Sequence, residues 1–453
     1  MRPPVLEVAW PSTPLTALTH LPLLALPSAA SYATLPILYD TYKAAAPADN
    51  LVPFLGLLLA KRITLYACAL ATVFVAAQRS GDAPAGLGER FERITAEAIS
   101  PLTMPEEQTA EVRAVAQTLD ATPQAAQAAG LPVVFGALLF GAYVFNVLVA
   151  STPPPPPDPE ATDAILESLR SAFATIQPLS TASVCVFACN VEAQAFAAGL
   201  INGGQSFANS ADLSPDGSTS GEIELAPASV AAAAAALTCV ALAYVVPPAS
   251  AWPLQNTINA CIAIGVARVL QIPSLPALLA AVGGLALYDG VGTLFAATAA
   301  EPEVIVQSSS SVMESVAKAK LGATVGGVQA WQPGLLTVLL QGRLTDALGL
   351  GDVLAPSLIA GWCRRFDLRL EAVDGAAGDD AGSDGGGSGS YLGAALSGYA
   401  IGCVLLEVVP AELSRAALLF LVPSTTASVL IRLVERKELQ MAIAPDAPSS
   451  EDA

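Results

Sequence analysis

Charge is scarce in this chain. Only 13% of its 453 residues are charged, whereas a soluble globular domain typically has about 25%. Aromatic residues are also few, at 6%, while hydrophobic residues make up 53% of the chain and the mean hydropathy is +0.57. These values exclude an ordinary soluble domain and are typical of a protein that crosses a membrane several times.

Positive charge and metal ligands are in short supply too. The net charge is −19, which argues against nucleic acid as a partner. The chain has one histidine, His20, and its seven cysteines show no zinc-type spacing. A zinc site is therefore not expected, and the sequence predicts no metal or organic cofactor.

Long apolar runs are plentiful. A helix needs roughly 20 mostly apolar residues to cross a bilayer. Nine runs of suitable length occur, and the third is the weakest because it contains Pro178 and several polar residues. The nine cover residues 55–78, 132–151, 171–190, 228–248, 253–270, 274–297, 335–362, 391–410 and 414–432. The sequence predicts an all-α polytopic membrane protein with about nine transmembrane helices.

The chain divides into four parts. Residues 1–50 form an N-terminal extension whose apolar stretch is expected to be broken at Pro22 and Pro27; a targeting segment and an extra span both stay open. Two groups of helices follow, and an acidic tail that we expect to be disordered ends the chain. The parts are residues 1–50, 51–270 with a polar loop at 79–131, 271–435 with a flexible Gly/Ser/Asp loop at 371–390, and 436–453.

Basic residues predict the orientation. Positively charged segments follow predicted spans at Arg79, at residues 364–370 and at residues 432–437. With nine spans all three lie on one side, which is expected to be cytosolic. Lys61 and Arg62 fit this arrangement less well.

One acidic residue stands inside a predicted span. Asp289 interrupts the apolar segment "LALYDGVGTLF". A charged side chain at the bilayer centre costs from roughly 3 to more than 10 kcal/mol, so such a residue indicates a functional site. Its best partner is Asp352 in the next span, within "LGLGDVLAP". Asp346 is a competing acid, which we expect near the lumenal face of the membrane.

Two facing carboxyl groups in adjacent helices have a well-known use. They cannot both ionise cheaply, so one keeps a proton and the pair titrates as a unit. Aspartic proteases use this arrangement to activate water. Tyr288 would line the site or tune the carboxyl pair. Gly349 and Gly351, on either side of Leu350, would permit local unwinding of the helix. A proton-coupled transporter or channel is an alternative reading of the same acids.

The two acidic motifs resemble those of a known family. "YD" in one span and "GLGD" in the next are similar to the GxGD intramembrane aspartyl proteases, related to presenilin. The wider context, including "LGLGDVLAPSLIAGWCRRFD", "WPLQNTINACIAIGVARVLQIPS" and "GYAIG", resembles the signal peptide peptidase family over roughly residues 130–435.

The resemblance implies a function. It implies an intramembrane aspartyl endopeptidase that cleaves remnant signal peptides or type II membrane proteins. Asp289 and Asp352 would be catalytic, with Tyr288, Gly349, Leu350 and Gly351 in support. Transmembrane peptides and the lipid bilayer are the implied partners, and a homo-oligomer stays open. The endoplasmic reticulum is the expected location, with Golgi and vacuolar or lysosomal membranes open.

A third family motif departs from the expected pattern. The family has Gln-Pro-Ala-Leu where this chain has Arg415, Ala416, Ala417 and Leu418. In the family this segment helps hold the substrate. Proline there blocks regular helix, whereas Ala416 is expected to let helix form. A proteolytically weak member that acts as a substrate-binding or quality-control factor is therefore a second reading.

Overall fold

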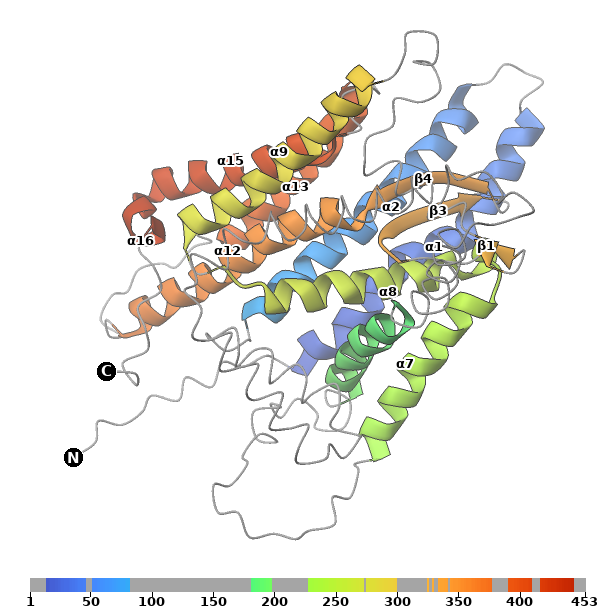
Figure 1. Cartoon of the computed structure of the whole chain (residues 1–453), viewed down its shortest axis with the longest axis horizontal. Coiled ribbons are helices and arrows are strands. Elements are labelled where there is room, and N and C mark those ends of the chain that lie inside the picture. Colours follow the sequence, from blue (N-terminus) through green and yellow to red (C-terminus); the bar gives the residue numbers. More distant parts are fainter. Residues whose placement is uncertain are drawn as a thin grey trace, which may run out of the picture.

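The fold is a bundle of long helices with one extended β-hairpin (Figure 1). The computed structural model describes residues 14–45, 51–81, 181–197, 227–272, 274–299, 324–325, 328–329, 333–340, 343–376, 390–409 and 416–443. Within this part, four helices are long and apolar enough to cross a membrane: His20–Ala44, Leu55–Gly81, Tyr391–Val408 and Leu418–Arg436. The predicted all-α membrane class is confirmed. The count of nine spans stays a prediction, because residues 132–151 and most of 171–190 lie outside the described residues.

The N-terminal extension contains a helix that packs into the bundle. Helix α1 (Pro14–Ala45) lies against α2 (Leu51–Gly81) and α8 (Pro248–Val269). The expected break at Pro22 and Pro27 is wrong, since both prolines lie inside α1. Prolines are tolerated in apolar helices where neighbouring groups satisfy the freed backbone. The hydroxyl of Ser28 lies 3.1 Å from the thiol of Cys68 on α2.

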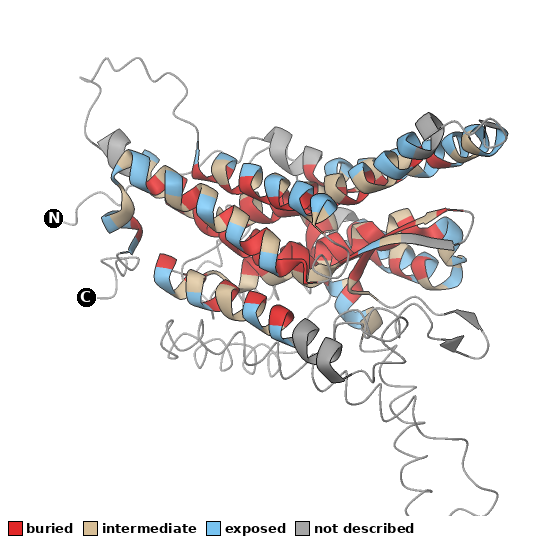
Figure 2. Ribbon diagram, turned by 90° about the horizontal axis from the view of Figure 1, so that it is seen from above, coloured by how far each residue is buried: buried red, intermediate tan, exposed pale blue. Residues whose placement is uncertain are grey.

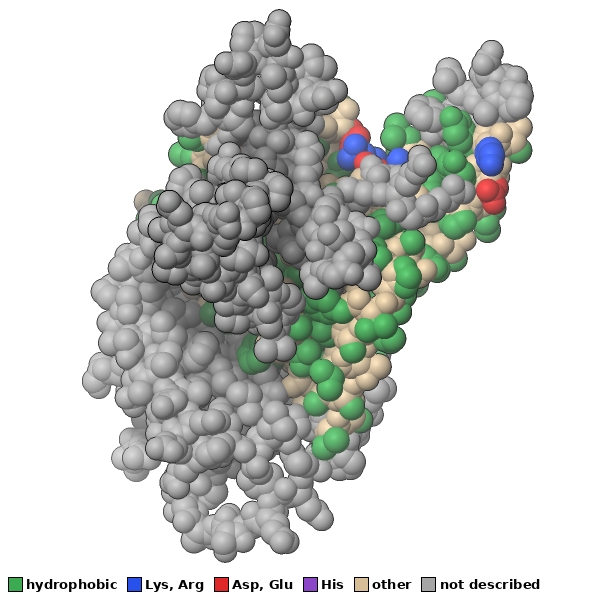
Figure 3. Space-filling model, turned by 45° about the vertical axis from the view of Figure 1, so that its right-hand side comes forward, with side chains coloured by type: hydrophobic (Ala, Val, Ile, Leu, Met, Phe, Trp, Pro, Cys, Tyr) green, Lys and Arg blue, Asp and Glu red, His purple; other side chains and the backbone are tan. Residues whose placement is uncertain are grey.

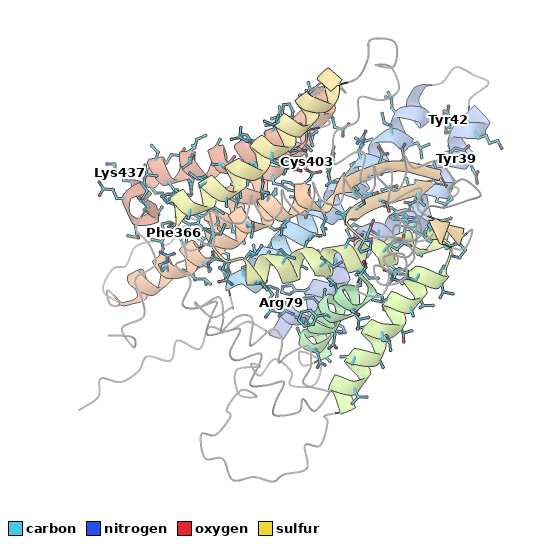
Figure 4. All side chains as sticks on the ribbon, in the orientation of Figure 1. Tyr39, Tyr42, Arg79, Phe366, Cys403 and Lys437 are labelled. Atoms are coloured by element: carbon cyan, nitrogen blue, oxygen red, sulfur yellow. The ribbon has the colours of Figure 1, made fainter. Side chains whose placement is uncertain are left out.

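The middle of the chain contributes three described helices. These are residues 181–197, α7 (Pro227–Val245) and α8. They share a small core that contains Cys185, Cys189 and Cys261. Arg79 lies at the end of α2 (Figure 4). It donates to the buried Glu192 of helix 181–197 over 3.0 Å, which ties these helices to the rest. The predicted polar loop at 79–131 lies outside the described residues after Gly81.

The C-terminal helices form the part that carries the acidic motifs. They are α9 (Leu275–Ala299), α12 (Leu350–Ala376), α13 (Tyr391–Val408), α15 (Leu418–Arg436) and the short α16 (Leu439–Ile443). Helix α15 packs against both α9 and α13, and α12 packs against these three helices and against α2 and α8 (Figure 1). Helix α16 forms within the tail that was expected to be disordered. Buried residues line the inward faces of these helices (Figure 2).

Small residues bring α13 and α15 close together. A Cβ atom added at Gly398 would lie 2.6 Å from the backbone oxygen of Ser424, and one at Gly402 would lie 3.1 Å from Cα of Leu421. The segment "GYAIG" therefore works as a small-xxx-small contact, which lets two membrane helices approach closely. This contact fixes α15 against the rest of the bundle.

The predicted span at 335–362 is wrong in its first half. Residues Leu335–Leu340 form strand β3 and Arg343–Gly349 form strand β4, paired antiparallel with an irregularity after Val338. Only from Leu350 onward is the segment helical. Hydropathy alone cannot separate a buried strand from a buried helix. The β-branched Thr337 and Val338 favour the strand. A second, shorter pair joins β1 (Thr324–Val325) and β2 (Val328–Gln329).

Asp367 joins α12 to the start of α13. Its carboxylate accepts from the backbone amides of Tyr391 over 2.8 Å and Leu392 over 3.0 Å. It thus satisfies two of the amides that a helix N-terminus leaves without an intrahelical partner. Phe366 beside it stacks on Trp362, with ring centroids 5.0 Å apart. The "RRFD" segment is therefore a structural junction in this fold.

The described surface suits a lipid environment. Hydrophobic side chains cover much of the described part of the face in Figure 3, and charged side chains gather in small groups. Asp346 of β4 pairs with Lys61 over 3.3 Å and with Arg62 over 3.2 Å. Arg62 also pairs with Glu407 of α13. Asp346 thus has a structural use, and the two basic residues that fitted the orientation rule poorly have acidic partners.

Candidate active site

Asp289 lies in the middle of α9 and is buried, with 4% of its surface exposed. Its Oδ2 atom accepts a hydrogen bond from the backbone amide of Leu418, over 3.3 Å. Leu418 is the first residue of α15. The carboxyl group therefore faces a helix N-terminus, whose free amides and dipole favour negative charge.

Asp352 lies in the first turn of α12 and is also buried, with 8% exposed. Its Oδ2 atom accepts from the backbone amide of Gly349, the last residue of β4, over 3.2 Å. An acidic side chain at the third position of a helix that accepts from the amide of the residue just before the helix forms half of a capping box. The strand-to-helix junction therefore fixes the position of this carboxyl group.

The packing brings the two acids into one region. Helices α9 and α12 contact each other, and both contact α15. Asp289 and Asp352 are thus two buried acids on contacting helices. Each also receives one backbone amide from a helix N-terminus. Such an arrangement can hold one shared proton between two carboxyl groups in an apolar bundle.

The residues predicted to support the site lie next to the two acids along the chain. Tyr288 is half-buried beside Asp289 on α9. Gly349 ends β4 and Gly351 lies in the first turn of α12, between Leu350 and Asp352. The backbone amide of Leu350 donates to the carbonyl oxygen of Gly334, over 2.9 Å, and closes the base of the hairpin.

Gly290 is a residue that the sequence reasoning missed. A Cβ atom there would lie 2.9 Å from the side chain of Leu419 on α15. The glycine lets α15 approach α9 at the level of Asp289. No signal in the sequence indicates this contact, because Leu419 lies far away along the chain.

The third motif lies at this contact. Ala416, Ala417 and Leu418 are all buried, and Arg415 lies outside the described residues. Regular helix starts only at Leu418, so the expected helix at Ala416 does not form among the described residues. A turn precedes it, closed by the amide of Leu419 on the carbonyl oxygen of Ala416 over 3.1 Å. A local turn and the hydrogen bond from Leu418 to Asp289 therefore occur here without the family's proline.

The hairpin leads directly into the site. Strand β4 ends at Gly349, three positions before Asp352, and in its sheet it pairs with β3 alone among the described strands. Strand β3 contacts α8 on its other side. Within the described part of the chain, no three His, Cys, Asp or Glu side chains are placed to hold a metal ion.

The fold and the site define a class: a multi-pass membrane protein with two buried carboxyl groups on neighbouring helices. Comparison with protein families is more specific, since the model described as "Signal peptide peptidase" matches residues 121–446. The chain belongs to the signal peptide peptidase family.

Individual relatives are distant. The chain is 26% identical over 198 residues to signal peptide peptidase-like 2A of Homo sapiens, which covers 42% of this chain and 34% of that protein. It is also 26% identical over 199 residues to signal peptide peptidase-like 2B of Homo sapiens, over 42% of this chain and 30% of that protein. The chain thus matches about a third of the length of these relatives. No solved structure matches it.

Proposed function

We propose that this protein is an intramembrane aspartyl endopeptidase whose catalytic pair is Asp289 and Asp352. The observation that carries the proposal is the pair of buried carboxyl groups on α9 and α12, each bonded to one backbone amide at a helix N-terminus. Membership of the signal peptide peptidase family supports the same reaction class.

The reaction follows from the two protonation states. The ionised carboxylate takes a proton from water as the water oxygen bonds to the peptide carbonyl carbon. The protonated carboxyl group donates to the carbonyl oxygen, which becomes negative. The tetrahedral intermediate then collapses, the C–N bond breaks, and the leaving nitrogen takes a proton from the pair. The apolar surroundings of Asp289 and Asp352 keep other water away.

The substrate would be a transmembrane segment that unwinds at the site. Its peptide carbonyls must leave their helical hydrogen bonds before water can attack, and the freed amides need new partners in the apolar interior. We propose that the outer edge of β4 supplies them by strand addition. Because β4 runs into α12, a peptide paired with it would lie beside Asp352. Remnant signal peptides and type II membrane proteins are the proposed substrates.

The test is cleavage of a transmembrane peptide by the purified protein in detergent. Asp289→Asn and Asp352→Asn should each abolish turnover, since each acid has a role that the other cannot supply. Asp367→Asn is the matched control: it is another buried aspartate of α12 that caps a helix away from the pair. Retained turnover in either of the first two variants would sink the assignment.

The altered third motif favours one second candidate, a family member that binds membrane segments but cleaves them weakly. Binding of the peptide with wild-type turnover no faster than that of Asp352→Asn would support it. A proton-coupled transporter is a further alternative, and proton flux in vesicles that depends on Asp289 would favour it.

The proposed location is the membrane of the endoplasmic reticulum, which imaging of the tagged full chain would test.

A further inference from the structure

Two asparagines of α8 bind the backbone of β3 as a neighbouring strand would. The side chain of Asn256 donates to the carbonyl oxygen of Thr337 and accepts from the amide of the same residue, both over 2.8 Å. Asn259 donates to the carbonyl oxygen of Leu335 and accepts from the amide of Gly334, again over 2.8 Å. We call Asn256 and Asn259 the asparagine clamp.

Both side chains of the clamp are buried, and both of their amide groups are hydrogen-bonded. Asn256 is 2% exposed and Asn259 is 0% exposed. They lie three residues apart, and so on one face of the helix. The second amide hydrogen of Asn256 is donated to the hydroxyl of Ser28 on α1, over 3.2 Å. A satisfied polar network of this kind specifies one arrangement of its elements, because any slip would leave polar groups unpaired in an apolar interior.

We propose that Asn256 and Asn259 are positioning residues that set where the substrate is cut. The inference rests on the proposed protease function. Helix α8 leads through a short connection into α9, which carries Asp289, and β4 leads directly into α12, which carries Asp352. By fixing β3 against α8, the clamp holds the hairpin that precedes Asp352 against the helix that precedes Asp289.

The clamp also determines how a substrate is registered. It occupies the edge of β3 that faces α8. Among the described strands, an added strand would therefore pair with the outer edge of β4. A slip of two residues would keep the same side chains on each face but would move the hairpin by about 7 Å along its axis. The substrate bond presented to Asp289 and Asp352 therefore depends on the clamp.

The test is a map of the cleavage products by mass spectrometry. Asn256→Asp and Asn259→Asp keep the side-chain shape but replace an N–H donor with an oxygen that repels the strand carbonyl. Asn259→Ser is a milder variant that is more certain to fold. Thr257→Val is the matched control, since Thr257 lies on the same helix and donates to its own backbone at Pro253.

The expected result is a spread of cleavage to neighbouring bonds, with kcat lowered roughly tenfold and KM changed less. Thr257→Val should keep the wild-type map. If the asparagine variants cut the same bonds in the same proportions, the clamp only satisfies buried backbone groups and the proposal is overturned, whatever the loss of folded protein.

A second measurement separates this inference from the proposed function. If the wild-type protein does not cleave, the proposed function is wrong and the assignment of cleavage position falls with it. Hydrogen exchange at residues 334–340 then decides whether the clamp holds the hairpin at all. The aspartate variants should speed exchange there about tenfold relative to Thr257→Val. Unchanged exchange would overturn the clamp itself.

Discussion

The backbone amide of Leu418 donates a hydrogen bond to Asp289, across 129 positions of sequence. This bond joins the third family motif to the first, since Leu418 begins α15 and Asp289 lies within α9. Asp352 receives a similar bond from Gly349, at the N-terminus of its own helix. The two acids thus have one helix N-terminus each, and the altered motif at residues 415–418 provides one of them.

The first prediction concerns this amide. Replacing Leu418 by its 2-hydroxy acid analogue removes the N–H donor and keeps the side chain. A hydrogen bond to a charged group contributes about 1.5–3 kcal/mol, so turnover should fall roughly 10- to 100-fold. Leucine reintroduced by the same incorporation route is the control. Turnover within twofold of that control would show that the Leu418 amide does not support the reaction.

The second prediction concerns the contact between α13 and α15. Gly398→Ala places a Cβ atom against the backbone of Ser424, so the helices must separate. Overpacking of this kind costs about 1–3 kcal/mol of folding free energy. Separation should also move Leu418 away from Asp289 and reduce cleavage. Gly393→Ala is the control on the same helix, since its nearest contact would be an ordinary 3.4 Å. Thermal unfolding in detergent measures both variants, and equal melting temperatures would contradict the packing argument.

Part of this site was accessible from sequence because burial in membrane makes polar residues conspicuous. Asp289 and Asp352 interrupt apolar runs, and so they could be found without a structure. Gly290 and Asn259 could not, because their roles depend on partners that are far away in sequence. Nothing in the sequence around Gly290 reveals that Leu419 approaches it.

The hairpin was missed for a different reason. Residues 335–349 are apolar enough to count toward a span, and hydropathy does not record backbone conformation. The decisive bonds come from Asn256 and Asn259, which satisfy the inner edge of β3 from another helix. Tertiary context therefore decided between strand and helix. The same limit applies to Pro22, which was expected to break a helix that packing maintains.

The third prediction concerns the stability of the α12–α13 junction, which lies beyond the predicted membrane segment of α12. Asp367→Ala leaves the amides of Tyr391 and Leu392 unpaired and should cost about 1–2 kcal/mol, as for other lost helix caps. Asp367→Asn should cost less, because its carbonyl oxygen still accepts. Glu371→Gln, at an exposed position of the same helix, is the control. If Asp367→Ala and the control Glu371→Gln have the same melting temperature, the cap does not stabilise the fold.

The same residue predicts a dependence on pH. Burial raises the pKa of Asp367 above its ordinary value of 3.8, and its two amide hydrogen bonds lower it in part. The folded state therefore binds the proton more readily than the unfolded chain. The contribution of this group to stability decreases as pH rises from the unfolded pKa through the folded pKa. The difference in melting temperature between wild type and Asp367→Asn should change in this window. A difference that is constant with pH would contradict the shift.

The fourth prediction is topological. The predicted Gly/Ser/Asp loop at residues 371–390 is wrong in its first part, because α12 continues to Ala376. The rest of the segment follows the basic residues 364–370 and should be cytosolic. A protease site inserted within residues 377–389 should be cut from the cytosolic side of sealed vesicles. A site inserted in the polar loop at 79–131 should be cut from the same side, because Arg79 marks it as cytosolic too. Protection of the first site with cleavage from the lumen would invert the orientation.

The last prediction concerns the departure in the third motif. A proline at position 416 would hold the backbone before α15 out of a helix by its fixed ring. Here a local turn, closed by the amide of Leu419 on the carbonyl oxygen of Ala416, precedes α15, and the one tertiary bond given for this backbone joins the amide of Leu418 to Asp289. We expect a backbone held in this way to engage substrate more weakly, with the chemistry of Asp289 and Asp352 unchanged. The double variant Arg415→Gln, Ala416→Pro should therefore lower the substrate concentration for half-maximal cleavage and leave kcat within about twofold. Arg415→Gln alone separates the charge from the ring, and it should reproduce little of the change. If the double variant leaves both binding and turnover untouched, the third motif does not limit substrate handling in this protein.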